Sequence, residues 1–188
     1  MESTPNPSVM KFVSNKILVN TSYEFLNIKE AEEFPLIKSI FSFPFVKSVF
    51  INTNFISITK IETIDWQNIA QHIRSFILDE LNSGVLVQNK EQTINVVSSS
   101  NKLEDKVKKY TNIETDINAI LQEYITPLVE SDGGYISLKS FQDGIVTVSL
   151  KGACSGCPSS TITLKNGIES LLKEKIGDII KKVVASQD

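Results

Sequence analysis

Residues 135–158 read YISLKSFQDGIVTVSLKGACSGCP and set the architecture of the second half of the chain. Apolar and polar residues alternate along Tyr135–Phe141 and again along Ile145–Leu150, which is the pattern of strands with one buried face. Asp143-Gly144 lies between the two runs, and this dipeptide is typical of a tight hairpin turn. The stretch therefore predicts a β-hairpin that leads directly into a glycine-rich loop with two cysteines.

Cys154 and Cys157 are the only cysteines in the chain, and they form a Cys-x-x-Cys pair. Pro158 follows at once and suits the first turn of a helix. Backbone N–H groups at such a helix start would stabilise a thiolate on Cys157, which both metal binding and disulfide exchange require. Gly152 and Gly156 let the loop turn tightly. The pair is the candidate functional site, at a strand-to-helix junction.

The chemistry of the pair has three competing interpretations, because structural zinc and iron–sulfur sites normally take four protein ligands. A mononuclear metal site lacks a second Cys-x-x-Cys, and the only histidine, His72, lies in a different predicted domain. A thioredoxin-like redox pair fits the junction, but an antiparallel hairpin precedes it and no proline follows Pro158. A homodimer whose two pairs hold one [4Fe–4S] cluster satisfies ligand number and softness. The spacing leaves these three nearly level.

Two buried, unreactive cysteines are the least favoured interpretation, because a glycine-rich loop is a poor place to bury a side chain.

The composition bears on whether the protein binds nucleic acid. The chain has 188 residues, 41% of them hydrophobic and 22% charged, with a formal net charge of −3. It shows no basic run, and Arg74 is its single arginine, which argues against nucleic acid as a partner.

No apolar run reaches membrane-spanning length, so a membrane partner is not expected. Residues 1–7 lack the features of a signal or transit peptide, which predicts a cytoplasmic protein. A reducing compartment favours a metal or redox role for the cysteines over a structural disulfide.

The length allows two small domains, and the pattern along the chain predicts a first domain over 1–87, a polar linker over 88–110 and a second domain over 111–188.

The first domain is predicted from local apolar periodicity and turn signals. Its expected elements are a hairpin over Met10–Val13 and Ile17–Val19, a helix over Lys29–Ser42, strands over Val46–Ile51 and Phe55–Thr59, and a helix from Asp65 to Asn82. The linker is rich in serine and charge, with a transient strand at Thr93–Val97. It is expected to be flexible.

The second domain opens at Thr111-Asn-Ile-Glu114, a capping-box pattern, and Asp132-Gly133-Gly134 should stop its first helix. The expected buried stripe of that helix is Ile113, Ile117, Ile120, Leu121, Tyr124 and Leu128. After the hairpin come a helix from Pro158 and a strand over Lys181–Ala185. The fold class is therefore α+β, with two small α+β domains and an α-β-β-α-β order in the second.

Several motifs resemble a known family. Ser131-Asp-Gly-Gly134, Phe141-Gln-Asp-Gly-Ile145 and the run from Leu150 to Ile168 resemble the C-terminal domain of NifU and of the Nfu iron–sulfur cluster proteins. The first segment is similar to the N-terminal domain of the Nfu subgroup. Its matching motifs are Thr4-Pro-Asn-Pro7, Phe34-Pro-Leu36, Val46–Phe50, Asn54–Lys60 and Asp65-Trp66.

The resemblance implies a scaffold or carrier, not an enzyme, that shares a [4Fe–4S] cluster between two subunits and delivers it to apo-proteins. Cys154 and Cys157 match the family's cluster ligands. Implied partners are apo iron–sulfur client proteins, an upstream assembly scaffold as cluster donor, and a second copy of the chain in the loaded state. The alternative function is a thioredoxin-like dithiol–disulfide oxidoreductase.

Three other motifs receive structural interpretations. Thr4-Pro-Asn-Pro7 is expected to be a stiff lead-in to the first strand and not a recognition element. The aromatic residues of Ser42-Phe-Pro-Phe45 are expected in the core instead of in an exposed client-binding patch. His72 falls on the polar side of its helix, which predicts a solvent-exposed histidine that binds no metal.

Overall fold

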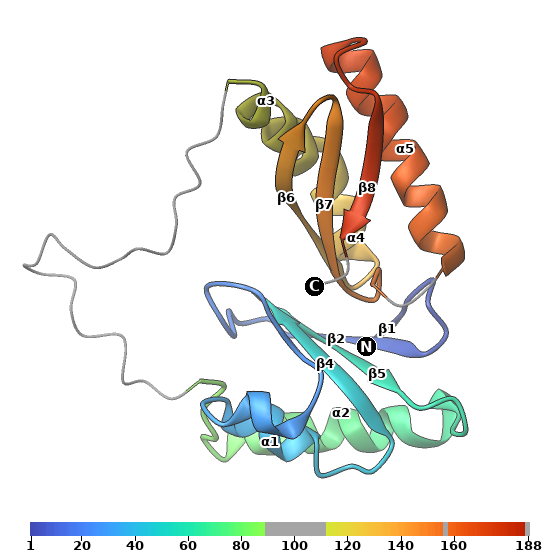
Figure 1. Ribbon diagram of the computed structural model, residues 1–188. Coiled ribbons are helices and arrows are strands. Elements are labelled where there is room, and N and C mark those ends of the chain that lie inside the picture. The colour runs from blue at the N-terminus through green and yellow to red at the C-terminus, as the bar shows by residue number, and fades with distance from the viewer. Residues whose placement is uncertain (89–111, 156–157, 187–188) are drawn as a thin grey trace, which may run out of the picture.

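The computed structural model describes residues 1–88, 112–155 and 158–186, which form two α+β units (Figure 1). The N-terminal unit comprises β1 Glu2–Ser3, β2 Val9–Val13, β3 Tyr23–Phe25, a 3-10 turn Ile28–Ala31, α1 Pro35–Ile40, β4 Val46–Asn52, β5 Phe55–Lys60 and α2 Trp66–Asn82. The C-terminal unit comprises α3 Asn112–Ile120, a π-helical segment Leu121–Ile125, α4 Thr126–Ser131, β6 Gly134–Gln142, β7 Ile145–Gly152, α5 Pro158–Ile176 and β8 Lys182–Ser186. The α+β class is confirmed; the expected linker strand and Thr111 lie outside the described residues.

The sheet of the N-terminal unit is antiparallel, with the strand order β1-β2-β5-β4-β3. The expected hairpin between 10–13 and 17–19 is wrong, because β2 pairs with β5 and 17–19 form no strand. The chain after β2 runs past the β4–β5 turn instead, where the Leu18 N–H donates to the Thr53 carbonyl at 2.6 Å. The partner strand of β2 lies more than 40 residues away in sequence. Local periodicity predicts that a strand forms but does not identify the strand with which it pairs.

The single helix expected over Lys29–Ser42 is also corrected. A 3-10 turn ends at Ala31, and α1 begins only at Pro35. Pro35 has no N–H to continue a helix from the preceding turn, and it forces Phe34 out of helical geometry, to φ −122° and ψ 80°. The expectations for β4, β5 and α2 are confirmed, with Asp65 at the N-cap of α2.

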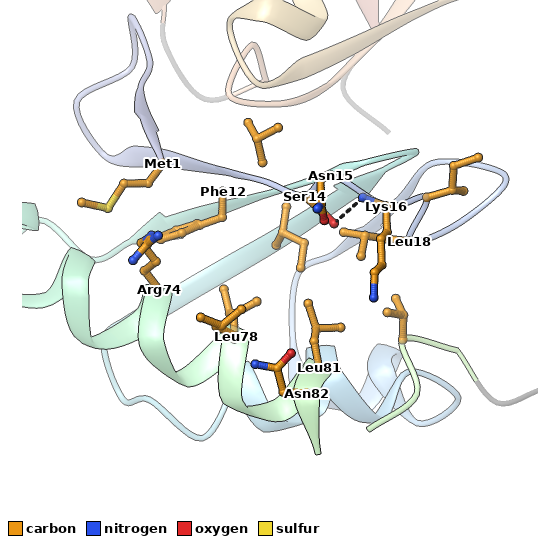
Figure 2. Close-up of a pocket in the computed structure, with 15 residues that line it drawn as sticks. Met1, Phe12, Ser14, Asn15, Lys16, Leu18, Arg74, Leu78, Leu81 and Asn82 are labelled. Atoms are coloured by element: carbon orange, nitrogen blue, oxygen red, sulfur yellow. Dashed lines mark hydrogen bonds between the residues drawn. The ribbon is translucent and has the colours of Figure 1, made fainter. Parts of the chain in front are cut away.

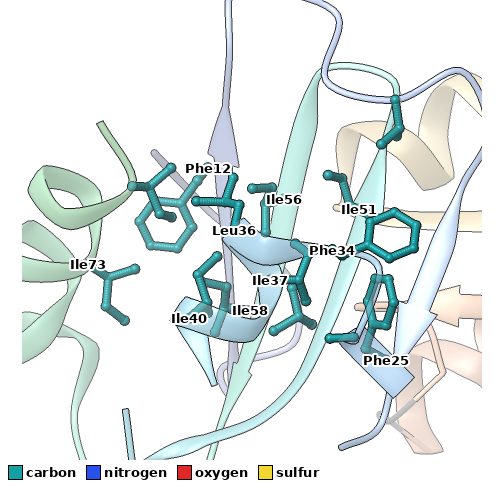
Figure 3. Packing of buried hydrophobic residues seen from close by; sticks show 14 residues of the cluster. Phe12, Phe25, Phe34, Leu36, Ile37, Ile40, Ile51, Ile56, Ile58 and Ile73 are labelled. Atoms are coloured by element: carbon teal, nitrogen blue, oxygen red, sulfur yellow. The ribbon is translucent and has the colours of Figure 1, made fainter. Parts of the chain in front are cut away.

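Helices α1 and α2 cover one face of this sheet, and the side chains between them form the first core (Figure 3). The fully buried members drawn there include Leu36, Ile37 and Ile40 from α1, Ile73 from α2, and Ile51, Ile56 and Ile58 from the sheet. Phe43 and Phe45 are half-buried, with the Phe43 ring 4.9 Å from that of Phe76. His72 is exposed, as expected, and its ring contacts Phe43 edge-on at 5.6 Å.

The sheet of the C-terminal unit has the order β6-β7-β8. β6 and β7 form the predicted antiparallel hairpin, and the turn residues Asp143 and Gly144 both take positive φ, at 51° and 85°. β8 lies parallel to β7, joined to it through α5. The predicted α-β-β-α-β order is confirmed, so the loop with the cysteines connects the central strand of this sheet to its long helix.

The helix before β6 departs from its expected buried stripe. A π-helical segment at Leu121–Ile125 adds a residue to one turn and rotates every later side chain relative to the sheet. As a result, Ile125 and Val129 are buried at 6% and 2% exposure. Tyr124 and Leu128, which regular helical spacing placed in the core, are 40% and 62% exposed. In the part of the chain described here, none of the helices has the length and apolar character needed to cross a bilayer.

Candidate metal centre at the cysteine loop

The loop after β7 is held by hydrogen bonds from both sides. The Ala153 N–H donates to the Gly133 carbonyl at 3.2 Å, which ties the loop to the end of α4. The Ser155 hydroxyl donates to the Gly152 carbonyl at 2.8 Å and closes a tight turn. From the first turns of α5, the Thr161 hydroxyl donates to the Cys154 carbonyl at 3.2 Å. Cys154 therefore sits in a fixed backbone frame.

Gly133, Gly134 and Gly152 form a glycine corner beneath this frame, and two of them take conformations that favour glycine, with φ of 80° at Gly133 and 66° at Gly152. At Gly134 the constraint is space: a Cβ there would lie 2.7 Å from the Cys154 sulfur and 2.9 Å from the Lys151 carbonyl oxygen. Gly133 stops the preceding helix as expected, but the contact between Gly134 and the sulfur was missed. The sequence signal for this contact is that two glycines stand in a row: one is enough to end a helix, so the second has another role.

Cys154 is only 7% exposed and belongs to the core of the C-terminal unit. The expectation that a glycine-rich loop would leave its cysteines unburied is therefore wrong for Cys154. The glycine corner removes side chains that would otherwise displace its sulfur, and this allows the burial. Cys157 lies outside the described residues, so the pairing of the two sulfurs stays a prediction.

The described part of the chain shows no ready-made metal site. Among the described residues, no group of three or more His, Cys, Asp or Glu side chains is placed to hold a metal ion. His72 lies on the exposed surface of α2, in the N-terminal unit. Within these residues a single chain thus presents part of a coordination sphere, and soft thiolates are the ligands it can contribute.

The N-terminal unit also contacts the loop. The Asn6 side-chain amide donates to the Ala153 carbonyl at 3.2 Å, and the Glu24 carboxylate accepts the Gly152 N–H at 2.9 Å. Asn6 is 6% exposed. Thr4-Pro-Asn-Pro7 is therefore more than the stiff lead-in expected of it, because one of its side chains binds the residue next to Cys154.

A hollow of about 440 Å³ lies elsewhere, between β2, residues 14–18 and α2 (Figure 2). Phe12, Ile77 and Leu81 line it, with Arg74 at its edge. Its described lining contains no Cys, His, Asp or Glu. It lies on the helix-covered side of the N-terminal sheet.

Two family models match separate parts of the chain. Residues 1–84 match the family model described as "Scaffold protein Nfu/NifU N terminal", and residues 117–184 match "NifU-like domain". The chain is 36% identical to the human "NFU1 iron-sulfur cluster scaffold homolog, mitochondrial", over 95% of this chain and 68% of the human protein.

The chain is also 34% identical to "NifU-like protein 4, mitochondrial" from Arabidopsis thaliana, over 95% of this chain but only 62% of the plant protein. Among solved structures, it is similar to the solution structure of a NifU-like protein from Saccharomyces cerevisiae. That likeness has 28% identity and a TM-score of 0.42, and it covers 48% of this chain and 82% of the yeast chain.

Proposed function

This chain belongs to the Nfu family of NifU-like iron–sulfur cluster scaffold proteins, and we propose that it carries a [4Fe–4S] cluster between two copies of itself and transfers it to apo-proteins. The observation that carries the proposal is Cys154, held by hydrogen bonds of the loop before α5, in a unit whose described residues gather no other set of ligands. Family membership supports cluster binding; the cluster type and its sharing are the proposal.

Ligand number supports the shared cluster. A [4Fe–4S] cluster is normally held by four cysteine thiolates, and Cys154 with Cys157 supplies two per chain. Two chains therefore complete one cluster. In each chain the residues around Cys154 fix the backbone, and the start of α5 directs N–H groups towards incoming negative charge.

Transfer would proceed by ligand exchange. A thiolate of the client protein binds an iron atom as one carrier thiolate leaves and takes up a proton, so no net electron transfer is needed. A cluster at an interface between two chains can be approached by client thiolates, whereas one enclosed by a single chain cannot. The carrier is not an enzyme in this scheme, and an upstream assembly scaffold supplies the cluster.

The alternative dithiol–disulfide oxidoreductase is not favoured. β7, the strand before Cys154, pairs antiparallel with β6 and parallel with β8, so strand direction is not the reason. The reason is that the matching family models and the human relative are described as NifU-like and iron–sulfur cluster scaffold proteins. The cytoplasmic location stays a prediction, since the human and Arabidopsis relatives are named as mitochondrial proteins.

Anaerobic reconstitution with iron and sulfide tests the proposal. The loaded protein should gain a broad absorption near about 400 nm, with about four irons per two chains. Its mass should be that of two 20.9 kDa chains. Cys154→Ser and Cys157→Ser should each abolish the absorption and the dimer. A loaded protein that remains monomeric, or disulfide-reductase turnover in iron-free protein, would contradict the proposal.

A further inference from the structure

The sheet of the N-terminal unit is buried on both faces. Successive residues of a strand point to opposite sides. In β5, Ile56 and Ile58 face the helices, while Phe55 and Ser57 face the other way and are still only 3% and 1% exposed. Figure 1 shows what covers that second face: the C-terminal unit lies against it, opposite α1 and α2.

Polar side chains on the second face are paired with the C-terminal unit. The Ser57 hydroxyl donates to the Gly133 carbonyl at 2.7 Å, and the Asn52 amide donates to the Glu130 carboxylate at 2.8 Å. The Lys11 ammonium donates to the Ser131 carbonyl at 3.3 Å. Buried polar groups are stabilising only when they have such partners. Ser57 and Asn52 therefore indicate a surface built to be covered.

The covered segments are those that flank the cysteine. Together with the bonds from Asn6 and Glu24, the N-terminal unit binds residues within 130–133 and 152–153. Contact is close enough that a Cβ on Gly152 would lie 2.8 Å from the Phe50 ring. Most of these hydrogen bonds end on backbone atoms. The N-terminal surface therefore recognises the backbone conformation at and around the glycine corner more than particular side chains.

We propose that the N-terminal sheet is a latch on the cysteine loop of the cluster-free chain, which must release before the loop can meet a second subunit. This inference rests on the proposed function, because a cluster shared by two chains requires one loop to face the other. With the latch closed, the backbone of Gly152 and Ala153 is bonded to the N-terminal unit and Ala153 is 3% exposed, while Cys154 packs in the core of the C-terminal unit. The docked unit occupies the approach that the second chain would need.

The negative charge of a bound cluster would affect how firmly the N-terminal sheet holds the cysteine loop. A [4Fe–4S] cluster with four thiolate ligands carries net negative charge, and Glu24 places a carboxylate at the Gly152 N–H, two residues before Cys154. Loading therefore repels Glu24 and favours release, and closing of the latch opposes loading to the same extent, because the two equilibria are linked. The empty carrier is shielded and the loaded carrier is open.

Amide hydrogen exchange on the full metal-free chain tests whether the latch exists. The Gly152 N–H reports on it, since its acceptor is Glu24 of the other unit. Ser57→Asp places a carboxylate against the Gly133 carbonyl, and the two repel each other when the units are docked. In the undocked state water can solvate the aspartate, so the substitution favours undocking. Gly152 should then exchange roughly tenfold faster or more, as expected when a buried partner is lost. Ser75→Asp, on the exposed surface of α2, is the matched control and should leave it unchanged.

Alkylation by iodoacetamide tests whether the latch also restrains opening of the loop that holds Cys154. In the reduced, metal-free chain, modification of Cys154, read by mass spectrometry, should be faster in Ser57→Asp by a factor similar to that for Gly152 exchange. Glu24→Ala is a second variant, at a half-buried position, for use if Ser57→Asp does not fold. Equal exchange rates or equal Cys154 alkylation rates in wild type and the folded variant would overturn the latch.

Reconstitution separates the latch from the proposed function. Faster cluster uptake by Ser57→Asp than by wild type and by Ser75→Asp, to the same final iron content, supports the latch. Equal uptake rates would overturn it as a gate. If neither protein takes up a cluster, the proposed function fails, while exchange and alkylation still decide whether the cysteine loop is latched.

Discussion

At Gly134 the missing side chain is what makes room for the Cys154 sulfur. Its φ is not in the left-handed region, so the backbone alone would accept alanine. The obstacle is the sulfur 2.7 Å from the position of a Cβ, with the Lys151 carbonyl behind it. The same residue therefore shapes both the core and the candidate metal centre.

Gly134→Ala should lower the free energy of unfolding by about 1–3 kcal/mol, the usual range for overpacking a core. It should also weaken cluster retention, because the sulfur must move. Gly167→Ala is the control: it lies in α5 with nothing within 4 Å of a Cβ, and alanine should stabilise the helix by about 0.5–1 kcal/mol. Urea unfolding and the visible absorption of the loaded protein measure the two effects. An unchanged Gly134→Ala protein would refute this account of the site.

At the scale of elements, the π-helical segment decides which residues of the first C-terminal helix reach the core. Val129→Ala should cost about 2 kcal/mol, in the range for truncating a buried aliphatic side chain. Leu128→Ala should change the free energy of unfolding by less than about 0.5 kcal/mol, because Leu128 is 62% exposed. Urea unfolding of both variants checks this. The reverse order would mean that regular helical spacing continues to the end of the helix.

Glu169 joins α5 to β8. Its carboxylate accepts a hydrogen bond from Lys173 at 2.6 Å and from the Val183 N–H at 3.0 Å, and these bonds, the first above all, lower the pKa of Glu169 below its usual value. A carboxyl whose folded-state pKa is lowered stabilises the fold above its unfolded pKa, and the effect is lost as pH falls through the folded value.

Glu169→Gln should therefore be less stable than wild type at neutral pH, and the difference should disappear in acid, once the pH has fallen below the lowered pKa of the wild-type carboxyl. The effect should be small, because the pair is open to solvent and screened by salt. Urea unfolding at both pH values measures it. A difference that persists in acid would point to packing and not to charge as the role of Glu169.

At the scale of the whole molecule, hydrogen bonds from buried polar groups join the two units. Asn52→Asp would set a carboxylate against that of Glu130, where an amide now donates at 2.8 Å. Docking should weaken by about 1–3 kcal/mol, the cost of leaving a buried polar group unsatisfied.

Adding Glu130→Gln to Asn52→Asp should restore most of that loss, since the glutamine amide can donate to the new aspartate. Urea unfolding of the two single variants and the double variant of the metal-free chain completes the cycle. Additive losses without rescue would show that the Asn52–Glu130 hydrogen bond does not hold the units together.

Local pattern was enough for much of the fold. The β6–β7 hairpin follows from alternation about Asp143-Gly144, and Ile168 and Leu172 mark the buried face of α5, both at 0% exposure. The Cys-x-x-Cys pair and its strand-to-helix junction are likewise visible in consecutive residues. These features depend on neighbours a few positions apart, where the period of a strand or helix is set by backbone geometry.

Contacts between distant segments were decided only when the chain folded. β2 pairs with β5, and the π-helical turn places Val129 instead of Leu128 in the core. Asn6 binds Ala153 and Ser57 binds Gly133, 147 and 76 residues away in sequence. Backbone carbonyl and N–H groups are the same at almost every residue, so the sequence does not show which of them a distant strand or polar side chain will bind. That choice depends on which segments tertiary packing brings together.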